Sequence, residues 1–129
     1  MSITIAKHYY NELNGWERSL SFHLNDILEL EKSLRLIISR NSIVDIAAKV
    51  EVHQLLIDKV TDKMHLLQNE ITSQEKLLLK ENKFIPDQEI AGSIEKKQVN
   101  LTQRVKHIEK EFVDVKFYCN AFLSEMLKK

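Results

Sequence analysis

The chain has 129 residues, 43% of them hydrophobic, and its 19 basic side chains balance its 19 acidic ones. A formal charge of zero argues against nucleic-acid binding and against a polybasic membrane anchor. Two glycines and one proline argue against turn-rich sheets and glycine-rich phosphate loops, and a single cysteine excludes an internal disulfide. With no membrane-spanning apolar run and no secretory leader, we expect a helical chain in the cytoplasm.

The first predicted helix covers about residues 8–39. Its apolar side chains recur at alternating spacings of three and four residues, which is typical of a helix that buries one stripe. His23 occupies a position in this stripe where an apolar side chain is expected. The stripe consists of Leu13, Trp16, Leu20, His23, Ile27, Leu30, Leu34 and Ile37.

The second predicted helix covers about residues 43–82 and carries a stripe with the same spacing. His53 and Gln74 are its polar members. Pro86 marks the turn that follows, because proline suits the first position of a helix and disfavours helix at the residue before it. The stripe consists of Ile43, Ile46, Val50, His53, Ile57, Val60, Met64, Leu67, Ile71, Gln74 and Leu78.

The third predicted helix covers about residues 87–128. Asp87 and Glu89 are expected in its first turn, where negative charge is favoured. Its stripe includes Gln98 and the single cysteine, Cys119. The members are Ala91, Ile94, Gln98, Leu101, Val105, Ile108, Phe112, Val115, Cys119, Phe122 and Met126.

Short connections between these helices predict one all-α domain over residues 1–129, an elongated antiparallel up-down-up three-helix coiled-coil bundle. When the stripes are aligned from turn to turn, Gln74 falls opposite Gln98. The same alignment puts His53 in one layer with Cys119, and His23 in the next layer.

The two core histidines allow three interpretations. Polar residues at buried coiled-coil positions can fix the register, which is the leading interpretation here. A proton-linked switch is the second, because burial disfavours the charged imidazole and lowers its pKa below about 6.5. The third is a metal or ligand sensor built on His23, His53 and Cys119, since zinc accepts imidazole and thiolate ligands.

An enzyme is not expected. Cys119 beside His53 pairs a nucleophile with a base, but a narrow coiled-coil core offers no cleft for a substrate. We therefore expect no catalytic residues, no metal and no cofactor, and we interpret Cys119 as a small buried hydrophobe.

The outer positions of the rod are more apolar near the first turn than near Pro86. Large exposed apolar patches mark interaction surfaces. We expect a non-catalytic interaction or scaffolding module that self-associates as a dimer or larger assembly, with an unknown protein partner or an ordinary surface as alternatives. The predicted interaction surface consists of Phe22, Leu28, Leu36, Val52, Leu55, Val113 and Phe117.

The overall plan resembles the three-helix coiled-coil repeats of spectrin-type rods, which also carry a tryptophan in the first helix, here Trp16. The likeness covers most of the chain and is architectural. It implies the bundle and no functional residue.

Overall fold

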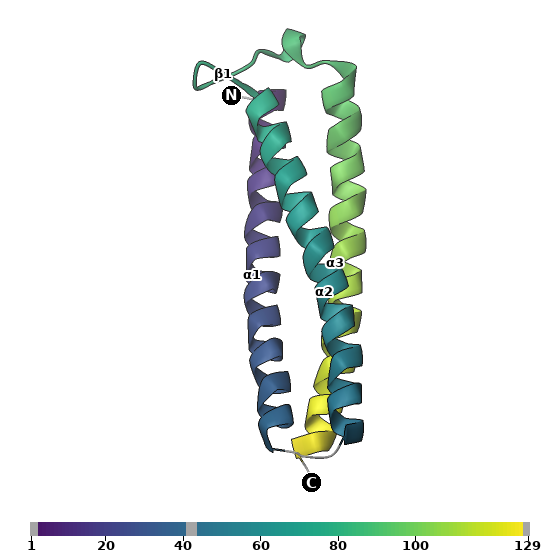
Figure 1. Ribbon diagram of the computed structural model, residues 1–129. Helices are drawn as coiled ribbons and strands as arrows, with labels where there is room; N and C mark the ends of the chain where they lie inside the picture. Colours follow the sequence, from purple (N-terminus) through teal and green to yellow (C-terminus); the bar gives the residue numbers. More distant parts are fainter. Residues whose placement is uncertain (1–2, 41–43, 128–129) are drawn as a thin grey trace.

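A computed structural model describes residues 3–40 and 44–127 of the chain. Its three long helices are α1 (Ile5–Arg40), α2 (Val44–Leu77) and α3 (Gly92–Leu127), and each packs against the other two. Figure 1 shows an elongated up-down-up bundle, in which α3 ends beside the junction of α1 and α2. The predicted all-α three-helix fold class is confirmed.

The core follows the predicted stripes, so the buried side chains form layers across the three helices. One layer joins Leu20, Val60 and Phe112, all of which are buried. Trp16 and Val115 lie at the edge of the core and are partly buried. Further buried members of the stripes are Leu13, Ile27, Leu30, Leu34, Ile37, Val50, Ile57, Met64, Leu67, Ile71, Leu101, Val105 and Ile108.

The connection between α2 and α3 differs from the prediction. α2 ends at Leu77 instead of near residue 82, and a hairpin of β1 (Leu79–Lys80) and β2 (Lys83–Phe84) follows. Its two-residue turn has positive φ at Glu81 (54°) and Asn82 (64°), as a type I′ turn requires. A low glycine content was expected to disfavour such turns, but asparagine also tolerates this conformation.

Pro86 does not begin the third helix. It is extended and precedes a short 3₁₀ helix, η1 (Asp87–Glu89), and α3 starts only at Gly92. Asp87 instead accepts a hydrogen bond at 2.9 Å from the backbone N–H of Ile5, the first residue of α1. An acidic side chain expected to favour its own helix therefore caps a different one, which explains why α1 begins earlier than residue 8.

The remaining predicted boundaries, the start of the second helix at 43 and the end of the third at 128, lie outside the described residues. Among the residues that the structure describes, no helix is long and apolar enough to cross a membrane.

Candidate functional site

The glutamine layer predicted from the register is confirmed. Gln74 and Gln98 are both buried, and Gln74 Nε2 donates to Gln98 Oε1 at 3.2 Å and to the carbonyl of Ile94 at 2.9 Å. Gln98 Nε2 donates to the carbonyl of Tyr9 at 3.2 Å and to Glu12 at 3.1 Å. These bonds join all three helices near the hairpin end of the rod.

His53 is buried, as predicted, with 5% of its surface exposed. Its ring stacks on Phe122 at a centroid distance of 4.5 Å and lies 4.6 Å from the ring of Tyr118. The Nδ1 atom is hidden and has no hydrogen-bond partner. Burial therefore lowers the pKa of His53 and keeps the imidazole neutral.

Cys119 is a buried free thiol in the same core. Burial raises the pKa of the Cys119 thiol, which keeps it protonated and unreactive. Among the described residues, the hidden Nδ1 of His53 has no hydrogen-bond partner, so this nitrogen does not bond to the Cys119 thiol.

His23 was predicted to be buried in the core, but its side chain lies at the edge of the core and is partly exposed. Its side chain is 18% exposed, and Nε2 lies 2.8 Å from Glu109 Oε2, across the α1–α3 interface. Ser19 Oγ donates to the same carboxylate oxygen at 2.7 Å. The imidazole stacks on Phe112 at 4.4 Å, so one ring face is covered while one nitrogen has a charged partner.

Burial alone would raise the pKa of Glu109, but hydrogen bonds from His23 and Ser19 outweigh it and lower the pKa. The three side chains superficially resemble a serine, histidine and carboxylate triad. A triad, however, uses opposite nitrogens of the imidazole for the serine and the acid. Here Ser19 and Glu109 both contact Nε2 of His23, and its Nδ1 is hidden and has no hydrogen-bond partner.

Sequence reasoning missed Ser19 and Glu109. Ser19 lies one helical turn before His23, and Glu109 follows the core residue Ile108 on the flank of α3. A polar core residue near an interface needs a hydrogen-bond partner, and positions that flank the apolar stripes can supply one.

The metal interpretation lacks a ligand set. Among the described residues, no three His, Cys, Asp or Glu side chains lie close enough together to hold a metal ion. The small-ligand interpretation stays a prediction. Of its three predicted residues, only His53 lines the groove of about 330 Å³ between α2 and α3; His23 and the fully buried Cys119 do not line it.

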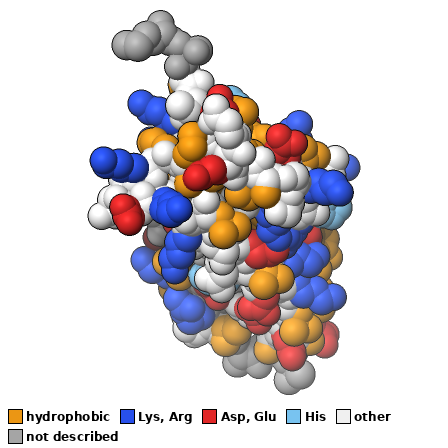
Figure 2. Space-filling view, turned by 90° about the horizontal axis from the view of Figure 1, so that it is seen from above, with side chains coloured by type: hydrophobic (Ala, Val, Ile, Leu, Met, Phe, Trp, Pro, Cys, Tyr) orange, Lys and Arg blue, Asp and Glu red, His pale blue; other side chains and the backbone are white. Residues whose placement is uncertain are grey.

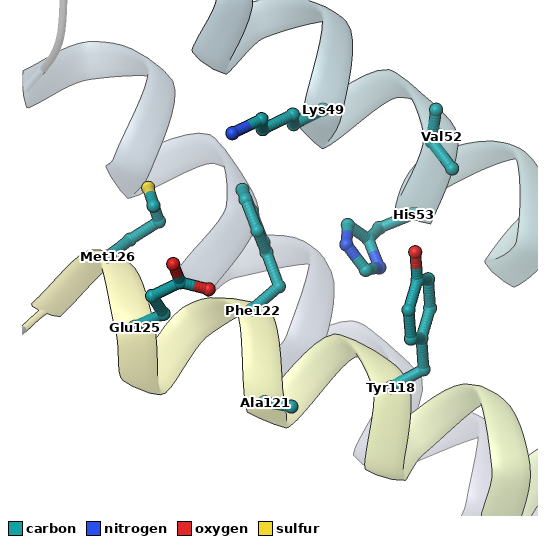
Figure 3. A pocket seen from close by; sticks show the side chains of 8 residues that line it. All are labelled: Lys49, Val52, His53, Tyr118, Ala121, Phe122, Glu125 and Met126. Carbon is teal, nitrogen blue, oxygen red and sulfur yellow. The ribbon is translucent and has the colours of Figure 1, made fainter.

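Figure 3 shows this groove, with His53 projecting from α2 between the rings of Phe122 and Tyr118. Lys49 from α2 and Glu125 from α3 lie at its rim. The remaining lining residues are Val52, Ala121 and Met126.

All seven residues of the predicted interaction surface are exposed, from Leu36 at 46% to Phe117 at 77%. They lie on different sides of the rod. Phe22 stands one turn from Ser19 and from Asp26, whose side chains reach α3. Phe22 therefore lies on the side of the rod where α1 packs against α3. Leu55 instead lies on α2, on the side away from the core.

Val113 lies on the same side of the rod as Phe22. It stands one turn from Glu109 and from Lys116, which bind Ser19 and Asp26 of α1. Figure 2, a view from the hairpin end, shows hydrophobic side chains interspersed with charged ones on that end.

Comparison with protein-family models, with characterised proteins and with solved structures finds no match for this chain.

Proposed function

We propose that the chain is a non-catalytic helical interaction module of the cytoplasm, which associates with further copies of itself through the half of the rod near the junction of α1 and α2. One observation carries this proposal. Phe117 and Phe22 are the two most exposed large hydrophobic side chains among the described residues, at 77% and 65%.

Burying these rings favours association. A phenylalanine side chain removed from water contributes about 1.5–3 kcal/mol. Because the chain has no formal net charge, copies approach one another without long-range repulsion. Val113 adds a third exposed apolar side chain, 58% exposed, one turn from Phe117.

The cytoplasmic location rests on Cys119. A free thiol that is buried and protonated fits a reducing compartment, where disulfides are not the means of stabilising a fold.

Sedimentation velocity over a wide range of protein concentrations tests the proposal. Wild-type protein should form a dimer or a larger assembly. Phe22→Glu and Phe117→Glu should each weaken association about tenfold to a hundredfold, which corresponds to the loss of one buried phenylalanine. Circular dichroism should show the helix content of wild type, since both side chains are exposed.

Val99→Glu is the matched control. Val99 lies on α3 in the hairpin half of the rod and is 59% exposed, close to the value for Val113. Its replacement should leave association unchanged. Wild-type protein that stays monomeric at the highest concentration would refute the proposal, as would equal weakening by Val99→Glu.

A further inference from the structure

The outer face of α2 is acidic around an exposed leucine. Leu55 is 56% exposed, and Glu51, Asp58 and Asp62 lie one to two turns from it, all exposed. Lys59 is the cation beside them. We call this set of five residues the α2 face.

The opposite side of the bundle is basic around exposed aromatic and aliphatic side chains. Arg18 lies one turn before Phe22 on α1, and Lys110 one turn before Val113 on α3, both exposed. Lys106 lies one turn before Lys110 on α3 and is exposed too. Together with Phe22, Val113 and Phe117, these three basic residues form a set of six, which we call the α1–α3 flank.

Four acidic residues lie on or near this flank. Asp26 of α1 pairs with Lys116 of α3 at 2.8 Å. Glu109 of α3 binds Ser19 and lies 2.8 Å from His23 Nε2. Glu29 of α1 is paired with Lys32 at 3.2 Å. Asp114 stands one turn from Glu111, whose carboxylate binds Lys63 of α2, and also one turn from Lys110, which offsets its charge.

Asp62 of the α2 face and Lys110 of the α1–α3 flank lie at matching heights along the rod, and Asp58 lies one turn nearer the α1–α2 junction. The core layer of Leu20, Val60 and Phe112 fixes this correspondence. Asp62 lies two residues beyond Val60 on the antiparallel helix, and Lys110 lies two residues before Phe112. Both therefore stand on the hairpin side of that layer.

The apolar centres also lie at matching heights. Leu55 lies between His53 and Ile57 of α2. Phe117 lies between Val115 and Cys119 of α3, which the register places in the same two layers.

We propose that copies of the chain pack side by side with their rods parallel, the α2 face of one copy on the α1–α3 flank of the next. This inference rests on the proposed self-association and specifies its interface. Leu55 would pack among Phe22, Val113 and Phe117, while Asp58 and Asp62 meet Arg18 and Lys110.

The alternative is a two-fold dimer in which one face packs on its own copy. Such a contact joins acidic with acidic or basic with basic residues, and like charges brought together at an interface cost free energy. Each helix packs on the other two, so the α2 face and the α1–α3 flank point in opposite directions. The proposed contact is therefore heterologous, and each copy leaves one face free for the next.

Paired charge reversals test the interface. The first variant carries Asp58→Lys and Asp62→Lys, so both of its faces are basic. The second carries Arg18→Glu and Lys110→Glu, so both of its faces are acidic. In sedimentation velocity each variant alone should stay monomeric at concentrations where wild type assembles, and an equimolar mixture should assemble again.

Added salt should weaken both the wild-type assembly and the mixture, because solvent-exposed charges are screened. Assembly of the first variant alone would show that the α2 face is not used, and a mixture that stays monomeric would equally overturn the inference. Circular dichroism checks that each variant is folded, and the milder single changes Asp62→Lys and Lys110→Glu repeat the test if a double variant is not.

The outcomes for the two proposals are distinguishable. Wild-type protein that never assembles refutes self-association itself. Wild-type protein that assembles, together with a first variant that also assembles alone, refutes only this choice of faces.

Discussion

His23 and His53 occupy equivalent positions in the heptads of their helices and have opposite environments. His53 is covered by Phe122 and its hidden nitrogen has no partner, so only the neutral ring is favoured. His23 Nε2 instead has a partner, Glu109 Oε2, at 2.8 Å.

The stability of the fold should depend on pH through His53. The unfolded imidazole has a pKa near 6.5, and burial lowers the folded value. Between the two values the unfolded chain binds more protons, so the free energy of unfolding falls as the pH drops below 6.5 and levels off below the folded pKa. Urea denaturation of wild type and His53→Leu on either side of pH 6.5 should show a flatter pH dependence in the variant.

His23→Leu is the matched comparison at the equivalent heptad position and should lower the free energy of unfolding. It leaves Glu109 half-buried without its imidazole partner, which should cost about 1 kcal/mol at neutral pH, since Glu109 is 37% exposed and solvent screens part of the loss. If the free energy of unfolding depends on pH equally in wild type and in His53→Leu, the His53 ring is solvated and the prediction is wrong.

The sequence could predict that both histidines mark the core, because heptad spacing identifies stripe positions. It could not separate their environments. That difference depends on one flanking residue of a distant helix, Glu109, whose relation to His23 only the packing of α1 on α3 establishes.

At the scale of elements, heptad spacing predicts the three helices and their register but not the ends of α2 and α3. Helix propensity continues through Leu78 and Leu79, yet the chain turns back there. Ile85 is buried, and Phe84 packs edge-on against Tyr10 at 5.3 Å. The hairpin is thus held by contacts with α1, which lie outside any local pattern.

Glu81 should be replaceable with a gain in stability. Its φ of 54° is left-handed, a conformation that costs most residues roughly 1–2 kcal/mol and asparagine less. Glu81→Asn should therefore raise the free energy of unfolding by about 0.5–1 kcal/mol in urea denaturation. Glu89→Asn, in the exposed 3₁₀ helix without positive φ, is the control and should show no such gain.

At the scale of the whole molecule, the two ends of the rod are stabilised differently. Near the hairpin, Gln74 and Gln98 join the three helices and Asp87 caps α1. Glu70 accepts hydrogen bonds from Arg104 and Lys97 across the α2–α3 interface, and these lower its pKa to about 2.

Near the α1–α2 junction, Nδ1 of the core residue His53 has no hydrogen-bond partner, and a groove opens beside the ring. Phe117 is exposed in this half of the rod, and Phe22 is exposed near the middle of α1; both belong to the proposed interface. Among the described residues, the half near the junction has the pairs Gln54–Glu31 and Lys116–Asp26 between helices, whereas the hairpin half has the glutamine layer and the cluster around Glu70.

Amide hydrogen exchange along α2 should report this asymmetry. Local opening is easier where fewer interactions are lost, so residues 45–60 should exchange faster than residues 61–77. Gln98→Leu removes the bonds from Gln98 to Gln74 and Tyr9, each worth about 0.5–1.5 kcal/mol, and should reduce the difference. Raising the protein concentration should slow exchange most over residues 51–62, because an associated copy covers the α2 face. Uniform exchange along α2, unaffected by Gln98→Leu or by concentration, would show that the rod opens as one unit and that its ends do not differ in stability.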